Sequence, residues 1–127
     1  RELHGYALLW DAHSIPSTVP RLFDGELTEL NIGSNDGASC PGDITAAVAA
    51  AASDGPYSSV VNARFKGGYI TRHYGDPANG VNALQLEIAQ RSYMDEVTGV
   101  FDPQKANRLR GTLRGMLEAF LAAAASA

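Results

Sequence analysis

The side chains best suited to chemistry begin with an imidazole close to a carboxylate. His13 follows the apolar run Tyr6–Trp10, in the segment Asp11-Ala12-His13-Ser14. Strand geometry continued through this segment would put Asp11 and His13 on one side, where the carboxylate would fix the imidazole tautomer. Imidazole is a common metal ligand, but a zinc site needs about three protein ligands and the sequence has no HxxH, HExxH or CxxC motif. His13 is therefore a candidate for one metal ligand, and an ordinary polar surface residue is the alternative.

A second candidate is a carboxylate inside a segment with strand character. Val81–Ala89 alternates bulky apolar residues with polar ones, and Glu87 lies on the polar side together with Gln85. If that side lines a cleft, Glu87 is placed to act as a general base towards a metal-bound water. In an open sheet the same residue would be a solvated carboxylate.

A basic cluster stands out in a chain whose net charge is −4. Its members lie close together in the sequence: Arg64, Lys66, Arg72 and His73. Asn62, Arg64 and Lys66 would share a face if the strand before them continued. Arginine presents a planar fork to carboxylates, and Gly67-Gly68 would let backbone N–H groups approach the same anion. The segment predicts a site for a small anion such as a dicarboxylate, with a solvated loop as the alternative.

Size and charge exclude several classes of protein. At 127 residues the chain has the size of one domain, and its acidic balance argues against general nucleic-acid binding. No stretch approaches the roughly 20 bulky apolar residues of a membrane helix, so we expect no membrane association. The single Cys40 excludes an internal disulfide and, with no signal-peptide pattern at the start, favours a reducing, cytoplasmic location. Because no local His would activate it, Cys40 is expected to be structural.

Apolar spacing and turn signals predict an α/β domain. We expect, in chain order, a strand over 6–10 that ends at Asp11, a long loop over 14–41, a helix over 44–53, a strand that begins at 59–62, a strand over 81–89 and a helix from 103. Asp43 would cap the first helix, and Asp102-Pro103 would open the last. The last helix carries an apolar stripe that we interpret as core packing: Leu109, Leu113, Met116, Leu117, Phe120 and Leu121.

Residues 11–40, 62–75 and 83–96 contain the motifs DAHSI, NARFKGGYITRHYG and LQLEIA. In this order they resemble the C-terminal half of the N-formylglutamate amidohydrolase family. The resemblance implies a zinc-carboxypeptidase-like α/β fold, a mixed sheet flanked by helices, of which this chain would be an incomplete, C-terminal portion. It implies that His13 is one zinc ligand, supported by Asp11 and Ser14, and that Glu87 is the catalytic base and acid. From their chemistry, we expect five residues of the second motif to bind the substrate carboxylates: Asn62, Arg64, Lys66, Arg72 and His73.

The resemblance also implies a reaction of histidine degradation, the metal-dependent hydrolysis of N-formyl-L-glutamate to formate and L-glutamate. The other zinc ligands would lie outside these residues, so we expect the chain to be part of a longer enzyme or to work with a partner that supplies the N-terminal half. Pro16, Ala63 and Asn82 replace residues usual in the family (Arg, Gly and, often, His), and these departures bear on substrate preference. The alternatives are hydrolysis of another N-acyl amino acid and a non-catalytic, anion-binding remnant of the fold.

Overall fold

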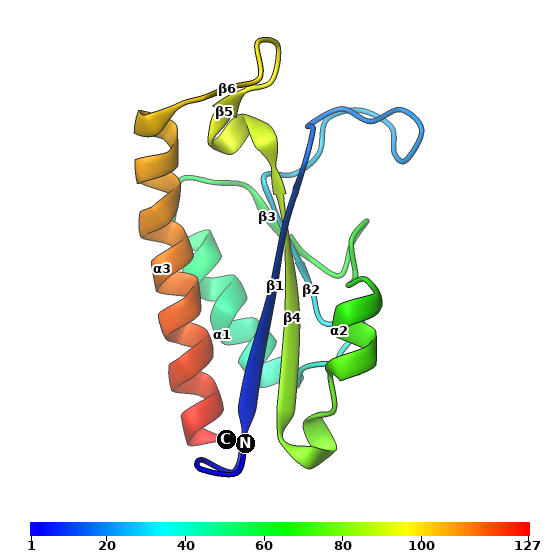
Figure 1. Ribbon diagram of the computed structural model, residues 1–127, viewed down its shortest axis with the longest axis vertical. Helices are drawn as coiled ribbons and strands as arrows, with labels where there is room; N and C mark the ends of the chain where they lie inside the picture. The colour runs from blue at the N-terminus through cyan, green and yellow to red at the C-terminus, as the bar shows by residue number, and fades with distance from the viewer.

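A mixed sheet of four strands forms the centre of the computed structural model, which describes residues 1–127, and helices lie on both of its faces (Figure 1). The sheet strands are β1 (Ala7–Ile15), β2 (Leu30–Gly33), β3 (Ser59–Val61) and β4 (Val81–Ala89). The helices are α1 (Gly42–Ser53), α2 (Tyr69–Tyr74) and α3 (Pro103–Ser126), with short 3-10 helices η1 (Pro77–Asn79) and η2 (Gln90–Ser92). Strands β5 (Met94–Asp95) and β6 (Val100–Phe101) form a separate hairpin. The predicted mixed α/β fold with flanking helices is confirmed.

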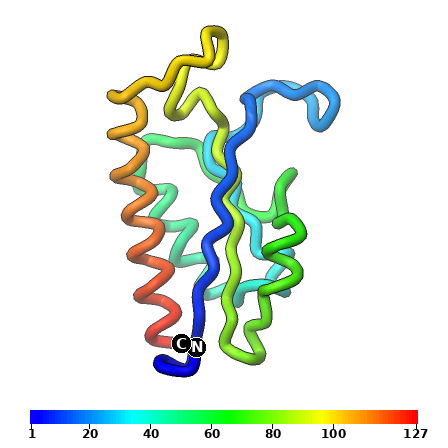
Figure 2. The backbone as a smooth tube through the Cα atoms, viewed as in Figure 1, coloured from blue at the N-terminus to red at the C-terminus, as the bar shows by residue number.

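The order of strands in the sheet is β1-β4-β2-β3. β1 and β4 run parallel, from the pair Ala7 and Val81 to the pair Ile15 and Ala89. β4 pairs antiparallel with β2, and β2 pairs parallel with β3. Figure 2 shows β1 and β4 side by side along the long axis of the molecule.

One face of the sheet is closed by α1 and α3, which pack against each other (Figure 1). The alternation of β4 sends Leu84, Leu86 and Ile88 into this face, and none of them is more than 8% exposed. Trp10 of β1 packs on Phe120 of α3, with ring centroids 5.9 Å apart. The same buried cluster contains residues from β2, α1 and α3, and from the turn before α1: Leu30, Ile32, Cys40, Ile44, Val48, Ala52, Leu109, Met116 and Ala124.

The start of α3 agrees with the prediction from Asp102-Pro103. The Asp102 carboxylate accepts hydrogen bonds from the backbone N–H groups of Gln104 and Lys105, at 3.0 and 3.1 Å, and so caps the helix. Although α3 is the longest helix, neither it nor any other combines the length and apolarity that a membrane crossing requires.

The apolar stripe predicted along α3 is confirmed only in part. Met116 and Phe120 are buried, whereas Leu117 and Leu121 are 40% and 57% exposed. One step along a helix rotates the side chain by about 100°, because a turn takes about 3.6 residues. The two leucines therefore turn away from the core that their preceding neighbours enter.

The prediction of a long loop over 14–41 is wrong, and so is the prediction that the first strand ends at Asp11. β1 does not stop at Asp11 but continues to Ile15, and β2 lies inside the expected loop. The four residues of β2 are all buried and pair with β3 on one side and β4 on the other. So short a strand shows no readable alternation, and its conformation is fixed by its neighbours in the sheet.

The first helix also begins differently from the prediction. α1 starts at Gly42 after Pro41, and no side chain caps it, so the expected cap by Asp43 is wrong. Asp43 lies within the first turn instead, where a negative charge is favourable beside the partial positive charge of the helix start.

The opposite face of the sheet carries α2 and the connection before it. This connection does not continue β3 as an extended segment, because Asn62 adopts a left-handed conformation with φ of 51°. It passes close to the end of β2, where a Cβ on Gly33 would lie 2.4 Å from the backbone carbon of Lys66. Residues 69–74 then form α2, a helix too short to show periodicity in the sequence. This face is less covered than the other, and it holds the candidate site.

Candidate active site

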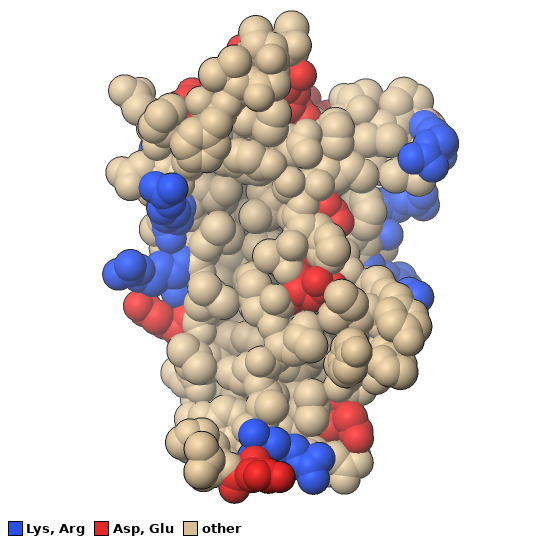
Figure 3. All heavy atoms as spheres, viewed as in Figure 1, with Lys and Arg blue, Asp and Glu red and all other residues tan.

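His13 and Glu87 lie side by side on adjacent strands, because the register of β1 and β4 pairs them directly. Both line a pocket of about 350 Å³ on the α2 face, formed by β1, β4 and the start of α2: Asp11, His13, Gly68, Tyr69, Ile70, Gln85 and Glu87. Neighbouring strands are about 4.8 Å apart, so paired side chains on one face reach the same small molecule. Figure 3 shows a few Asp and Glu atoms, in red, reaching the surface near the middle of this side of the molecule. The structure thus brings together the imidazole and the carboxylate that the sequence singled out.

Asp11 holds the imidazole of His13. The two residues lie on the same side of β1, as predicted, and His13 Nε2 donates a hydrogen bond to Asp11 Oδ1 at 2.8 Å. The His13 side chain is 48% exposed and that of Asp11 only 12%, so a nearly buried carboxylate orients a partly open ring. The other ring nitrogen, Nδ1, makes no hydrogen bond within the chain and is available to a ligand.

Glu87 is a buried carboxylate without a hydrogen-bonding partner for its side chain. It is 7% exposed. Burial raises the pKa of the Glu87 carboxyl above its usual value; the positive charge of a protonated His13 opposes the shift and the charge of Asp11 adds to it. A carboxyl with a raised pKa takes up a proton more readily near neutral pH, which is what a general base must do.

The residues of this chain fit one position of a zinc site and do not complete one. No group of three or more His, Cys, Asp or Glu side chains is arranged to hold a metal ion. His13 has the right chemistry for one ligand, with Asp11 to fix its orientation. A zinc site needs about three protein ligands, so further ones would have to come from outside residues 1–127.

Asn62 lies at a different place from the one predicted. Its Oδ1 accepts a hydrogen bond from the Ser34 N–H at 2.8 Å and its Nδ2 donates to Ser34 Oγ at 2.8 Å. It lines a separate pocket with Ser34 and Asp36, and not the pocket of His13 and Glu87. Asn62 therefore ties the connection after β3 to the end of β2.

The predicted common face of Asn62, Arg64 and Lys66 is wrong, because the left-handed residue at 62 ends the extended backbone. Lys66 Nζ pairs with Asp36 Oδ2 at 2.9 Å in an exposed ion pair, and Arg64 is exposed without a side-chain partner. None of these three residues lines the pocket of His13 and Glu87.

Arg72 and His73 belong to α2 and also lie outside the pocket lining. Arg72 Nη1 donates to the Gly67 carbonyl at 3.0 Å, and the His73 ring stacks on Tyr69 with centroids 5.0 Å apart. Since Tyr69 does line the pocket, His73 contacts the site through it. Ser14, expected to support His13, hydrogen-bonds instead to the Tyr93 hydroxyl at 2.7 Å.

Comparisons with known proteins agree with the motifs. The family model of N-formylglutamate amidohydrolase matches residues 1–94. The chain belongs to this family. The N-formylglutamate deformylases of Pseudomonas aeruginosa and Pseudomonas putida are 54% and 48% identical to it, over 121 and 124 residues. These matches cover 93% and 96% of the chain but 45% and 46% of the relatives, so the chain spans about half the length of the curated relatives it matches.

The solved structure of an N-formylglutamate amidohydrolase from Ralstonia eutropha has the same fold. Its TM-score is 0.83 at 24% sequence identity, and the match covers 99% of this chain and 48% of that one. The resemblance seen in the sequence is confirmed at the level of family and fold.

The sequence analysis did not identify three residues that line the pocket of this N-formylglutamate amidohydrolase family member: Tyr69, Ile70 and Gln85. Gln85 lies on the polar side of β4 with Glu87, and its Oε1 accepts a hydrogen bond from the Gly68 N–H. The alternation that singled out Glu87 was the signal for Gln85. No local signal pointed to Tyr69, because it enters the pocket through the unforeseen helix α2.

The departures from the family pattern lie outside the pocket lining. Asn82 is buried near the start of β4 and lines another cavity with His4 and Tyr6. Ala63 is exposed and keeps a negative φ, since the left-handed residue of this turn is Asn62. Pro16 is exposed directly after β1. None of the three contributes to the lining around His13 and Glu87.

Proposed function

We propose that this chain carries part of the active site of an enzyme that hydrolyses N-formyl-L-glutamate to formate and L-glutamate. The observation that carries the proposal is the paired His13 and Glu87 in one pocket of a chain from the N-formylglutamate amidohydrolase family. The names of the two Pseudomonas relatives support the choice of substrate.

Glu87 is the proposed general base and acid. Its carboxylate takes a proton from the attacking water, whose oxygen forms a bond to the formyl carbon. The same carboxyl then gives a proton to the amide nitrogen as the carbon–nitrogen bond breaks, so formate and the free amino group of glutamate leave. The raised pKa of Glu87 suits both transfers.

His13 is the proposed ligand for a zinc ion, through the ring nitrogen that does not bond to Asp11. When bound, zinc would polarise the formyl carbonyl and lower the pKa of a water. The zinc-carboxypeptidase-like nature of the complete fold belongs to the same proposal. Because the described residues hold no set of three ligands, we expect the 127-residue chain alone to bind zinc weakly and to turn over slowly. Stoichiometric zinc and full activity in the purified chain would contradict this.

The substrate carboxylates are the proposed ligands of the basic cluster. Arg72 is the member to test first, because it belongs to the helix whose first residues line the pocket. Arg72→Ala should raise KM for N-formyl-L-glutamate strongly, while Arg114→Ala, an exposed arginine of α3, should leave it unchanged. An unchanged KM in Arg72→Ala would remove Arg72 from the site.

The decisive assay is release of formate from N-formyl-L-glutamate by the chain completed with the part that corresponds to the rest of its relatives. Glu87→Gln should lower kcat by about 10²–10⁴-fold with little change in substrate binding, since a positioned general base contributes about that much. Glu118→Gln, an exposed glutamate of α3, is the matched control. Faster hydrolysis of an N-acetyl amino acid than of the N-formyl substrate would favour the alternative deacylase activity, and no hydrolysis of either would favour a remnant.

A further inference from the structure

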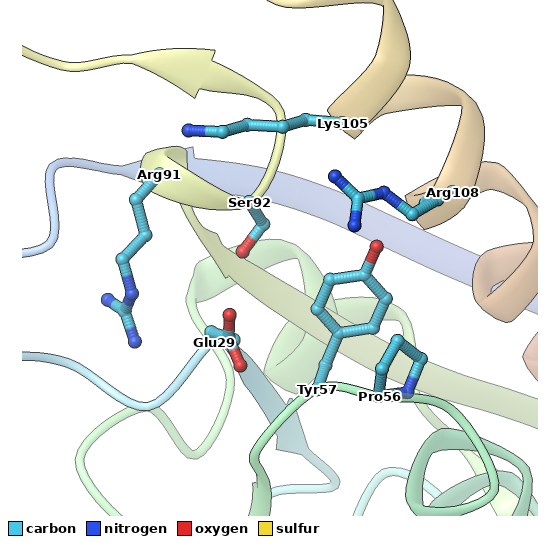
Figure 4. Close-up of a pocket in the computed structure, with 7 residues that line it drawn as sticks. All are labelled: Glu29, Pro56, Tyr57, Arg91, Ser92, Lys105 and Arg108. Carbon is cyan, nitrogen blue, oxygen red and sulfur yellow. The ribbon is translucent and has the colours of Figure 1, made fainter.

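A second pocket lies on the other face of the sheet from His13 and Glu87. It has a volume of about 230 Å³, shares no residue with the candidate active site, and is lined by side chains from η2, α3 and the segments that precede β2 and β3: Glu29, Tyr57, Arg91, Ser92, Lys105 and Arg108, with Pro56 beside Tyr57. Figure 4 shows these side chains converging on one space.

The pocket is positively charged in an acidic chain. Three cationic side chains, Arg91, Lys105 and Arg108, face one carboxylate, that of Glu29. Glu29 Oε2 already accepts hydrogen bonds from Ser58, from its backbone N–H at 2.8 Å and from its hydroxyl at 3.2 Å. These neutral donors fix the position of Glu29 and leave its charge in place, so the lining holds three positive charges against one negative charge.

Two of the cations have no partner within the protein. Lys105 and Arg108 form no ion pair and no side-chain hydrogen bond. Arg91 is braced from outside the pocket, where its Nη1 donates to Ser17 Oγ at 2.8 Å and its Nε lies 3.4 Å from Glu26 Oε1. In Figure 4 the Arg108 guanidinium lies next to the Tyr57 hydroxyl, which adds a neutral donor to the cationic ones.

Ser92 gives an independent sign of a ligand. The residue is 5% exposed and its hydroxyl has no hydrogen-bonding partner, although buried polar groups are almost always paired. Its Oγ is directed into the space between Arg91, Tyr57 and Glu29 (Figure 4). A buried hydroxyl left without a partner costs free energy, and a bound acceptor would remove that cost.

We propose that this pocket is a binding site for a compact, doubly charged oxyanion, a phosphate group. Arginine and lysine are the side chains that bind phosphate oxygens best, and the Ser92 hydroxyl supplies a short neutral donor. The three cations of the lining, less the one carboxylate, leave an excess of two positive charges, which matches the charge of the dianion. The volume is below the range of about 300–1,000 Å³ typical of pockets for larger organic ligands, which favours a small ion or a terminal phosphate. This site is independent of the proposed hydrolase activity.

The test is calorimetric titration of the 127-residue chain with inorganic phosphate, at constant ionic strength kept with sodium chloride. We expect saturable binding at one site, weakened at least tenfold by Arg108→Gln. Arg110→Gln removes another exposed arginine, which lies two residues along α3 and outside the pocket lining, and should change affinity less than twofold. Absence of saturable binding, or equal weakening by both variants, would overturn the proposal.

Ser92→Ala separates a ligand-binding hydroxyl from a structural one. Phosphate affinity should fall at least fivefold, while the unfolding midpoint without phosphate stays the same or rises, because the variant removes an unpaired buried group. An unchanged affinity, or a lower midpoint without phosphate, would overturn the role of Ser92. Titration with acetate in the same buffer tests the charge: acetate should bind at least tenfold more weakly, and acetate binding as tight as phosphate would refute the dianion assignment.

Discussion

The two faces of the sheet differ in what they bury. On the face covered by α1 and α3, β4 presents Leu84, Leu86 and Ile88 to an apolar cluster. On the face covered by α2, the same strand presents Gln85 and Glu87 to a pocket. One strand with alternating side chains thus serves a core on one side and a polar site on the other.

The difference shows how the molecule separates stability from chemistry. Burial in the apolar cluster of the closed face raises the pKa of the Cys40 thiol. The open face keeps a buried carboxylate with no partner for its side chain, which contributes little to stability and suits proton transfer. The comparison predicts that substitutions on the two faces have different consequences.

The largest effect on stability should come from the closed face. Phe120→Ala removes a 2% exposed ring that packs on Trp10, and it should lower the free energy of unfolding by about 3–5 kcal/mol. Leu121→Ala, at a neighbouring but 57% exposed position, should change it by less than about 0.5 kcal/mol. Denaturant titration of the two variants measures both free energies of unfolding. Equal losses of stability would contradict the assignment of Phe120 to the packed side of α3 and Leu121 to its exposed side.

An intermediate effect should appear where the connection before α2 meets the sheet. Gly33→Ala would place a Cβ 2.4 Å from the Lys66 backbone and should cost about 1–3 kcal/mol through overpacking. Gly111→Ala in α3 meets no atom within 4 Å and should raise stability by about 0.5–1 kcal/mol, since alanine favours a helix over glycine. Thermal unfolding shows whether each variant is less or more stable than the parent. An unchanged stability of Gly33→Ala would mean that the connection before α2 does not pack against β2.

The smallest effect on stability should come from the candidate base. Glu87→Gln should leave the free energy of unfolding at pH 7 unchanged or slightly higher, with a chelator present to exclude metal. The native pKa of Glu87 is raised above the usual 4.5, so its contribution to stability is present below pH 4.5 and lost as the pH rises through the raised value. The advantage of the glutamine variant should therefore shrink on going from pH 7 to pH 4. An advantage that grows at low pH would show that burial does not disfavour the charged carboxylate.

Much of the closed face could be predicted from the sequence, because its signals are local. The alternation over Val81–Ala89 and the cap at Asp102 gave β4 and the start of α3 at their observed positions. The prediction missed β2, because its four residues form a strand only by pairing with β3 and β4. The conformation of such a segment depends on which strands it pairs with, and a single sequence does not reveal that pairing.

The open face was harder to predict for the same reason. His13 and Glu87 were found by residue type and strand position, and the parallel register brought them together. The geometry around Asn62 was not foreseen, because its left-handed backbone and its bonds to Ser34 depend on a contact distant in sequence. Arg72 and His73 were predicted to bind an anion without being placed on any helix or strand, and the structure places them on α2.

The most direct test of the account is a double-mutant cycle on His13 and Glu87, measured as kcat/KM for N-formyl-L-glutamate in the completed enzyme. If the two side chains act as one unit across the strand pair, His13→Ala and Glu87→Gln each lose most of the activity, and the double variant loses hardly more than the worse single one. Losses that multiply, or a single variant that keeps full activity, would show that this pair is not the catalytic centre.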